Sequence, residues 1–265
     1  MTSEHTPPTD SMHKIARACT DPLWIQHRFL ATGHGETTDN GTATFIKFEG
    51  RHYVCTCAHV VEAAKDDNVL ALMIDRTVLN CADFQKGPSG KLVYRHIFRF
   101  PDRQRFDIAI APIDFHWDIL RTKKGKSAID LDAWQSVPWP QDPCYLAAGY
   151  PTEHKYSVEE KLAVRMTLIA AEPVSTMSPG SISFTLCSRV EAPHGYYFSG
   201  LSGGPIFLPE EADRLVPVGI IIEGGPSSKS APGSFISDGN TILVRGLTLT
   251  PTIFKEWLGL TDLGK

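Results

Sequence analysis

A serine set among glycines is the feature of this sequence with the clearest chemical meaning. In residues 199–205, Ser202 follows Gly200 and Leu201, precedes two more glycines, and leads into a short apolar run. Glycines lack the Cβ atoms that block close approach, so such a turn can expose a hydroxyl and direct backbone N–H groups at one point. The pattern predicts a nucleophile, Ser202, beside an oxyanion hole formed by the N–H groups of Gly200 and Ser202. A glycine-rich hairpin without chemistry is the alternative that this stretch alone leaves open.

Two other stretches offer the partners that a serine nucleophile needs. His59 lies just past the β-like run 53–57, where a strand end would hold the imidazole rigidly and leave its edge open. It is the predicted general base. Asp107 precedes the apolar run 108–113 and is predicted to accept a hydrogen bond from His59 and fix its tautomer. Asp102, in a charged loop after a proline, and Asp114, at the far end of the run, are weaker candidates for this role.

Two competing kinds of site fit the sequence less well. The string 200–204 also matches the G-x-S-x-G turn of α/β-hydrolases, but that fold needs its histidine after the serine, and all ten histidines precede Ser202. A zinc site at Cys55, Cys57 and His59 lacks a second ligand pair at a recognised spacing. We therefore predict no metal and no cofactor.

Short strands bounded by turn residues must position these groups. Ten β-like runs alternate with turn signals such as Glu49-Gly50 and Gly224-Gly225-Pro226, which is typical of a barrel or sandwich. The runs span residues 41–48, 52–57, 69–74, 108–113, 144–148, 162–170, 181–187, 205–208, 216–222 and 241–245. A terminal helix is predicted after Thr250, which can cap it, with Pro251 in the first turn and an apolar stripe before Gly259.

Together, the three chemical stretches resemble the trypsin-like (chymotrypsin-fold) serine peptidases. Residues 56–59 (Thr-Cys-Ala-His) correspond to the family's T-A-A-H block, residues 107–109 to D-I-A-L, and residues 200–205 to G-D-S-G-G-P. The separations of 48 and 95 residues also fit, and the resemblance covers roughly residues 25–260. It implies an all-β fold of two six-stranded antiparallel Greek-key β-barrels packed face to face, with a C-terminal α-helix and the site between the barrels.

The resemblance also implies a division of the chain. We expect a flexible N-terminal segment (1–22), an N-terminal barrel with the histidine and aspartate (23–122), and an inter-barrel connection (123–143). The expected C-terminal barrel (144–249) holds the serine, the oxyanion hole and the specificity pocket. A C-terminal helix (250–265) ends the chain. Substrate-binding positions carried over from the family are Tyr196 on the pocket floor and Ile222, Glu223 and Gly224 on its walls.

Departures from the family pattern bear on control and specificity. Leu201 replaces the aspartate that pairs with a newly cut N-terminus in the family's zymogens, so no such switch is expected. Val60 replaces a disulfide cysteine, and neither a secretory leader nor a PDZ-like extension is apparent, which favours a bacterial-type, cytoplasmic enzyme. No carboxylate stands at Tyr196, so cleavage after Arg or Lys is not expected.

Composition limits the partners. The chain has 265 residues, 42% hydrophobic and 21% charged, with a formal net charge of −4 and no apolar run near the ~20 residues that cross a bilayer. We expect a protein or peptide substrate and a regulatory protein partner that gates the site, and neither nucleic acid nor membrane. The function expected is a serine endopeptidase working through an acyl-enzyme. The alternatives are a catalytically silent trypsin-fold module that recruits a partner through its cleft, and an esterase or acyltransferase using the same triad.

Overall fold

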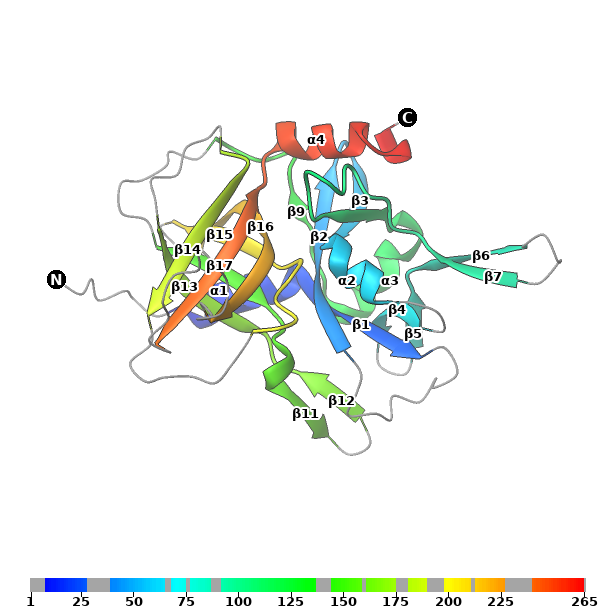
Figure 1. The fold of residues 1–265 in the computed structure, drawn as a ribbon, viewed down its shortest axis with the longest axis horizontal. Coiled ribbons are helices and arrows are strands. Elements are labelled where there is room, and N and C mark those ends of the chain that lie inside the picture. Colours follow the sequence, from blue (N-terminus) through cyan, green and yellow to red (C-terminus); the bar gives the residue numbers. More distant parts are fainter. Residues whose placement is uncertain are drawn as a thin grey trace.

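The computed structural model describes residues 8–27, 39–64, 68–74, 77–86, 92–136, 144–158, 161–174, 181–189, 198–210, 213–226 and 240–264. Strands dominate these residues and form two halves that lie side by side, with helix α4 extending from their boundary over the top of the N-terminal half (Figure 1). None of the helices in these ranges is long and apolar enough to cross a membrane.

The N-terminal half is a seven-stranded sheet. Six of its strands follow the order β5-β4-β1-β2-β3-β8, and the short β9 pairs with β2 in parallel. Glu49 and Gly50, both with positive φ, make the predicted tight turn between β2 and β3. The strands are β1 (Thr20–His27), β2 (Asp39–Phe48), β3 (Arg51–Thr56), β4 (Asn68–Ile74), β5 (Thr77–Asn80), β8 (Ala109–Pro112) and β9 (Ile129–Asp130).

The C-terminal half is a closed six-stranded barrel in the order β10-β13-β14-β17-β16-β15. Its interior is filled by the alternate apolar side chains of the strands, among them Tyr145, Leu186 and Val244, all 0% exposed. The strands are β10 (Tyr145–Gly149), β13 (Thr167–Pro173), β14 (Ser183–Arg189), β15 (Pro205–Pro209), β16 (Leu215–Pro226) and β17 (Thr241–Thr248).

Two hairpins stand apart from these sheets. Strands β6 (Ala82–Lys86) and β7 (Leu92–His96) pair with each other, as do β11 (Lys155–Val158) and β12 (Lys161–Val164). They project as separate ribbons from the body of the molecule (Figure 1).

The expectation of two closed barrels is confirmed for the C-terminal half and is met only in part by the N-terminal half. The described strands of that half form a half-barrel sheet whose continuous pairing runs from β5 to β8. The segment that holds β6 and β7 contacts this sheet through isolated hydrogen bonds: Cys81 N donates to the carbonyl oxygen of Leu70 in β4, and Arg99 forms an antiparallel bridge with Ile110 in β8. Strands β6 and β7 otherwise pair with each other as a separate hairpin.

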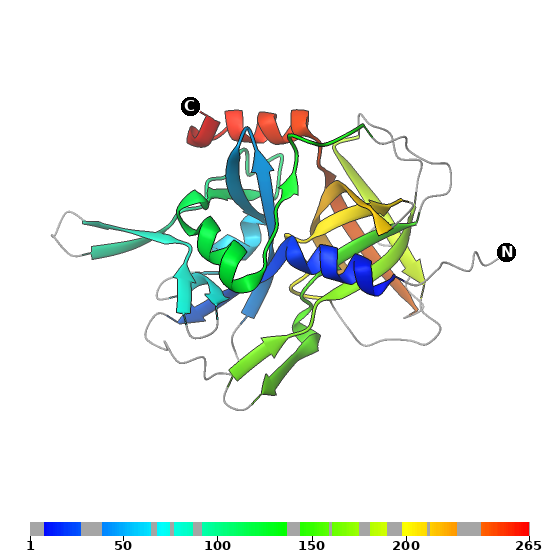
Figure 2. The ribbon, with the colours of Figure 1, turned by 180° about the vertical axis from the view of Figure 1, so that it is seen from behind.

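Helix α1 (Asp10–Ala18) lies where the sequence predicted a flexible segment over residues 1–22. The side chain of Thr9 caps it, and Ala16 is fully buried against the body. At its other end, Lys126 Nζ donates to the carbonyl oxygen of Arg17 at 3.0 Å and pairs with the buried carboxylate of Asp21 at 3.0 Å. The helix runs along the back of the molecule beside the barrel (Figure 2). The amphipathic stretch is therefore ordered by contacts with residues more than 100 positions away.

Helix α4 (Pro251–Gly259) confirms the predicted terminal helix. Thr250 Oγ1 accepts the N–H of Ile253 at 3.2 Å, and Phe254 and Trp257 are buried. Phe254 meets the rings of Phe48 and Tyr53 in the N-terminal sheet, each at 5.6 Å between centroids. The helix thus leaves the barrel after β17 and packs on the other half. The remaining helices are α2 (Ala58–Ala63), α3 (Asp114–Lys124) and the short 3₁₀ turns Thr152–His154 and Asp262–Gly264.

Candidate active site

A hollow of about 310 Å³ lies between the two halves and brings the predicted residues together. His59 borders it from the N-terminal half, and Gly200 and Ser202 border it from the C-terminal half. The full lining is Ile25, Asp39, Asn40, His59, Val60, Ala63, Phe198, Ser199, Gly200, Ser202, Ile222, Glu223 and Gly224. His59 and Ser202, which are 143 positions apart in the sequence, therefore line the same cavity.

His59 is held by the change from strand to helix at the end of β3. The strand ends at Thr56, Cys57 has extended backbone angles as the N-cap of α2, and His59 falls in the first turn of that helix. Because the neighbouring Ala58 and Val60 are buried while His59 faces outward, the imidazole is fixed at its base and remains 51% exposed. This is the strand-end placement that the sequence predicted.

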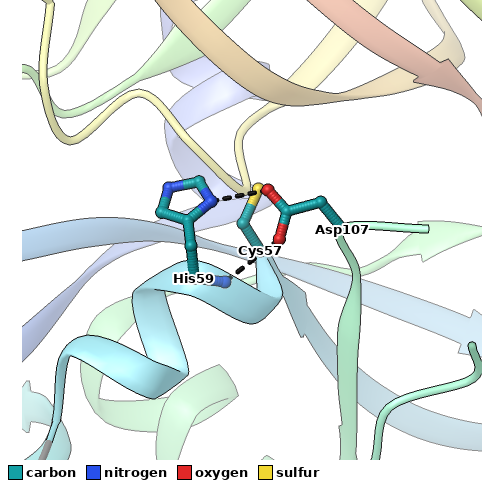
Figure 3. A group of neighbouring side chains, drawn as sticks. All are labelled: Cys57, His59 and Asp107. Atoms are coloured by element: carbon teal, nitrogen blue, oxygen red, sulfur yellow. Dashed lines mark hydrogen bonds and ion pairs between the residues drawn. The ribbon is translucent and has the colours of Figure 1, made fainter. Parts of the chain in front are cut away.

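Asp107 lies two residues before β8 and contacts both the ring and the backbone of His59. Its Oδ2 lies 2.5 Å from His59 Nδ1, and its Oδ1 accepts the backbone N–H of His59 at 3.0 Å (Figure 3). Burial raises the pKa of Asp107, but hydrogen bonds from the ring and backbone of His59 and from the N–H of Ala58, together with the attraction of the ring when it is protonated, outweigh it, so the pKa of Asp107 lies below the usual value. An ionised carboxylate accepts only, so Nδ1 carries the proton and Nε2 offers a lone pair.

Asp114, the weaker candidate for the same role, pairs with a different histidine. Its Oδ1 accepts the backbone N–H of His52 at 2.7 Å and lies 3.3 Å from His52 Nδ1. The ring of His52 stacks on Trp117 at 4.3 Å between centroids. This pair lies at the first turn of α3 and borders no part of the hollow.

Cys57 lies beneath the His59–Asp107 pair. Its Sγ donates to the carbonyl oxygen of Ile221 at 3.1 Å, across the interface between the halves, and the side chain is fully buried. Burial raises the pKa of this thiol well above its ordinary value.

Among the described residues, Cys57, His59 and Asp107 are the one group with the spacing of metal ligands. The donors do not suit an ion, because Nδ1 and the carboxylate already share a hydrogen bond of 2.5 Å and the thiol is protonated. This chemistry favours a hydrogen-bonded group over a metal site.

The loop that carries Ser202 is fixed through its carbonyl groups. Every carbonyl oxygen from Ser199 to Gly203 accepts a hydrogen bond. The donors, in chain order, are Thr152 N (2.6 Å), Thr42 Oγ1 (2.7 Å), Gly204 N (2.9 Å), Thr42 N (2.9 Å) and Thr44 Oγ1 (2.7 Å). Because the carbonyl oxygen of each peptide is held in this way, the orientation of every peptide plane in the loop is constrained.

Two N–H groups of this loop are left over. Between residues 200 and 204, those of Leu201, Gly203 and Gly204 donate to the carbonyl oxygens of Phe198, Ile221 and Leu201. The N–H groups of Gly200 and Ser202 have no acceptor within the described part of the chain. In a trans peptide the N–H points opposite to the C=O, so fixing the carbonyls of Ser199 and Leu201 also fixes these two donors.

Ser202 itself is half-buried, and its Oγ donates to the carbonyl oxygen of Ile222 at 3.4 Å. Among the described contacts, none is a hydrogen bond between this hydroxyl and the ring of His59. The two side chains face one hollow, and a rotation about the Cα–Cβ bond of Ser202 would redirect its hydroxyl. Hydrogen bonds of this kind are often long in the absence of substrate.

The residues carried over for substrate binding are placed in part. Tyr196 lies outside the described residues. Ile222 falls at an irregularity in the pairing of β16 with β17, and Ile222, Glu223 and Gly224 border the hollow beside Ser202. The carboxylate of Glu223 pairs with Arg245 at 3.1 Å, with both side chains exposed.

Sequence reasoning missed three polar side chains of β2. Asn40, Thr42 and Thr44, which we call the β2 clamp, are all buried and hydrogen-bonded to the serine loop or to the turn beside it. The signal available was an alternation of polar residues in an otherwise apolar strand. In the sequence this looks like an ordinary solvent-facing side of a strand, because its partners lie up to 159 residues away.

Comparisons with known proteins give distant structural matches. No family model matches the chain, and neither does any curated protein. Among solved structures, an HtrA-type protease AlgW with a tripeptide is 17% identical with a TM-score of 0.43, over 94% of this chain and 62% of that one. The chain therefore spans less than two thirds of that protein's length.

Two further matches are also to proteases. The thermostable serine protease AL20 from an extremophilic microorganism is 12% identical (TM-score 0.43, 91% of this chain and 95% of that one). Protease Anisep from Arthrobacter nicotinovorans is 12% identical (TM-score 0.46, 92% and 95%). At these identities and TM-scores the matches do not establish a shared reaction, so the chemistry of this chain rests on its own geometry.

Proposed function

We propose that the chain is a serine endopeptidase that cleaves peptide bonds through a Ser202-His59-Asp107 triad. The observation that carries the proposal is the pair of N–H groups on Gly200 and Ser202, fixed in direction yet without an acceptor among the described residues. Such a pair beside a nucleophile is suited to bind a negatively charged oxygen. The short contact between Asp107 and His59 supplies the base that the nucleophile needs.

The reaction follows from these placements. Ser202 Oγ attacks the carbonyl carbon of the substrate while His59 Nε2 takes the hydroxyl proton, and the carbonyl oxygen becomes negative between the two N–H groups. The tetrahedral intermediate collapses to an acyl-enzyme as the C–N bond breaks and His59 returns the proton to the leaving amine. Water, activated by the same imidazole, then releases the acid and restores Ser202.

The proposal extends to the architecture and the substrate. The N-terminal half-barrel sheet and the closed barrel would correspond to the two Greek-key barrels of the trypsin-like enzymes, with divisions at residues 23–122 and 144–249. The substrate would be a protein or peptide lying across the hollow beside Ile222, Glu223 and Gly224. A regulatory protein partner that gates the access of protein substrates to the site, and not the reactivity of Ser202 toward a small reagent, belongs to the proposal as well.

A second candidate is a catalytically silent module that binds a partner through the same hollow. The observation that favours it is the hydroxyl of Ser202, which donates to Ile222 instead of to His59. In this case the Asp107–His59 pair would be a structural contact only.

Reaction with a fluorophosphonate separates the two, because this reagent labels only a serine activated by a base. Intact-mass analysis of the wild type, Ser202→Ala and His59→Ala is the test. A single adduct on the wild type that is absent from both variants supports the peptidase. A wild type without an adduct, alongside retained folding, contradicts it and favours the silent module. Profiling with a peptide library then distinguishes a peptidase from an esterase on the same scaffold.

A further inference from the structure

The oxyanion-binding loop is held by the opposite half of the molecule, through the β2 clamp. Thr42 is fully buried, and its hydroxyl does two things at once: it donates to the carbonyl oxygen of Gly200 at 2.7 Å and accepts the N–H of Tyr150 at 3.0 Å. Its backbone N–H also donates to the carbonyl oxygen of Ser202 at 2.9 Å. One residue of β2 thus fixes the loop on both sides of Leu201.

Asn40 contacts the same loop indirectly, through Thr152. Its Nδ2 donates to the carbonyl oxygen of Tyr150 at 2.7 Å, and its Oδ1 accepts the hydroxyl of Thr152 at 3.4 Å. Thr152 in turn donates its N–H to the carbonyl oxygen of Ser199 at 2.6 Å, the bond that sets the direction of the Gly200 N–H. Asn40 is 6% exposed, so little water competes for these bonds.

At Gly200 the backbone of the loop packs closely against Tyr150 and Asn40. That residue has φ +94°, and a Cβ there would lie 2.5 Å from the carbonyl oxygen of Tyr150 and 2.9 Å from Asn40 Nδ2. The backbone of the loop therefore rests directly on the turn that Asn40 and Thr42 hold.

Leu201 anchors the loop from the barrel side without a charge. Its side chain is 0% exposed, and a Cβ added to Gly149 or Gly224 would lie 2.8 Å or 3.0 Å from one of its methyl groups. The anchor is therefore apolar packing, which does not depend on an ionised group.

We propose that Asn40 and Thr42 are positioning residues that set the oxyanion-binding N–H groups of Gly200 and Ser202, so that docking of the two halves alone forms the hole. This inference rests on the proposed function. In this inference, hydrogen bonds across the interface and the buried Leu201 fix the serine loop, in place of an ion pair between an aspartate at position 201 and a newly cut N-terminus. It follows that the full chain needs no proteolytic processing to form the hole.

The test is a kinetic comparison of Thr42→Val, Thr42→Ser and Asn40→Asp in the full, unprocessed chain. Valine keeps the shape of Thr42 but can neither donate to Gly200 nor accept from Tyr150, whereas serine can do both. Aspartate keeps the shape of Asn40 but sets a carboxylate against the carbonyl oxygen of Tyr150. The measurements are kcat and KM for p-nitrophenyl acetate and the rate of labelling by a fluorophosphonate.

Removal of one oxyanion donor costs on the order of 10²-fold in kcat. We expect a loss of about that size in Thr42→Val and Asn40→Asp, with KM changed little and with serine restoring most of the rate. The matched control is Thr248→Val, since Thr248 is also buried and its Oγ1 donates to the carbonyl oxygen of Ser181 at 2.5 Å, away from the loop. This variant should lose stability without loss of kcat.

The outcomes distinguish the inference from the proposed function. If the unprocessed wild type is not labelled, the proposed function fails. If it is labelled and both Thr42→Val and Asn40→Asp react at rates similar to Thr248→Val, the positioning role is refuted while the peptidase stands. Should Thr42→Val fail to fold, Asn40→Asp and Thr42→Ser decide: a wild-type rate in the former, or a large loss in the latter, overturns the inference.

Discussion

Replacement of Asp107 by asparagine is the sharpest perturbation of the candidate triad. In the wild type one carboxylate oxygen faces the backbone N–H groups of His59 and Ala58, and the other accepts the Nδ1 proton. Asparagine has a single oxygen. If that oxygen stays with the two N–H groups, its NH₂ group faces Nδ1, and the ring must carry its proton on Nε2. A ring in that tautomer cannot accept the proton of Ser202.

The expected loss follows from this geometry. The wrong tautomer lowers the rate by about 10⁴-fold, or roughly 5.4 kcal/mol of activation free energy. The other orientation of the amide keeps the right tautomer but sets its NH₂ group against the N–H groups of His59 and Ala58, at a cost of about 1–3 kcal/mol. Even this state predicts a loss of about five-fold to 160-fold.

The assay is the second-order rate of fluorophosphonate labelling, followed by intact mass at pH 7. The matched control is Asp114→Asn, because Asp114 contacts the backbone and ring of His52 in the same manner away from the hollow. We expect the control to label at the wild-type rate. A rate for Asp107→Asn within about five-fold of wild type would show that the carboxylate does not select the tautomer. An equal loss in the control would trace the effect to general destabilisation.

Further predictions concern stability and reactivity. Gly203→Ala should lower the free energy of unfolding by more than the ~1–2 kcal/mol of a positive φ, because its Cβ would overlap the Thr42 carbonyl oxygen; Gly50→Ala, at φ +72° in open space, should show the φ cost alone in the same urea titration. Leu201→Ala should cost about 2–5 kcal/mol by the same measurement and slow labelling of the serine. Since the pKa of Asp107 is lowered in the folded state, the ionised carboxylate contributes to stability fully above the unfolded-state pKa of about 3.9, and this contribution is lost as the pH falls through the folded-state pKa. The difference in free energy of unfolding between the wild type and Asp107→Asn should therefore shrink below pH ~4 in urea titrations. Burial raises the pKa of Cys81 to about 12, so this thiol should resist iodoacetamide at pH 8 until the chain is unfolded, as peptide mapping would show.

Local signals were sufficient for most strands of the fold. All ten β-like runs of the sequence coincide with strands, although the run 162–170 is divided between β12 and β13. Apolar, β-branched stretches between turn residues identify such strands without knowledge of their partners. Strand β1 was missed because it begins with Thr20, Asp21 and Pro22, and Asp21 is buried only because Lys124 and Lys126 pair with it from the far end of α3.

Closure of the sheets could not be predicted in the same way. Strands β6 and β7 form their own hairpin, and nothing in their composition indicates that this segment contacts the N-terminal sheet only through isolated pairings such as that of Arg99 with Ile110. Pairing depends on which edges meet in space, a property of the assembled sheet and not of a segment.

In the candidate site, too, local features were predicted from the sequence and contacts between the two halves were not. The contact between His59 and Asp107 was predicted from the spacing of two short stretches and is present at 2.5 Å. Placement of Ser202 on the same hollow was predicted as well, but its hydrogen bond to Ile222 was not. The contacts of Thr42 with the serine loop were also missed, since they arise only when two halves of the chain dock.

The position of α4 has a consequence for the timing of folding. The helix continues from the last strand of the barrel and lies on the N-terminal sheet, where Lys255 pairs with Glu49, 206 positions earlier, and Glu256 with Arg105, 151 positions earlier. Contacts between such distant parts of a chain form late and slowly, because the entropy of closing a long loop must be lost first. During synthesis the base and the nucleophile would therefore remain on unjoined halves. A nascent chain of the proposed peptidase would therefore not cleave its neighbours until the two halves have joined.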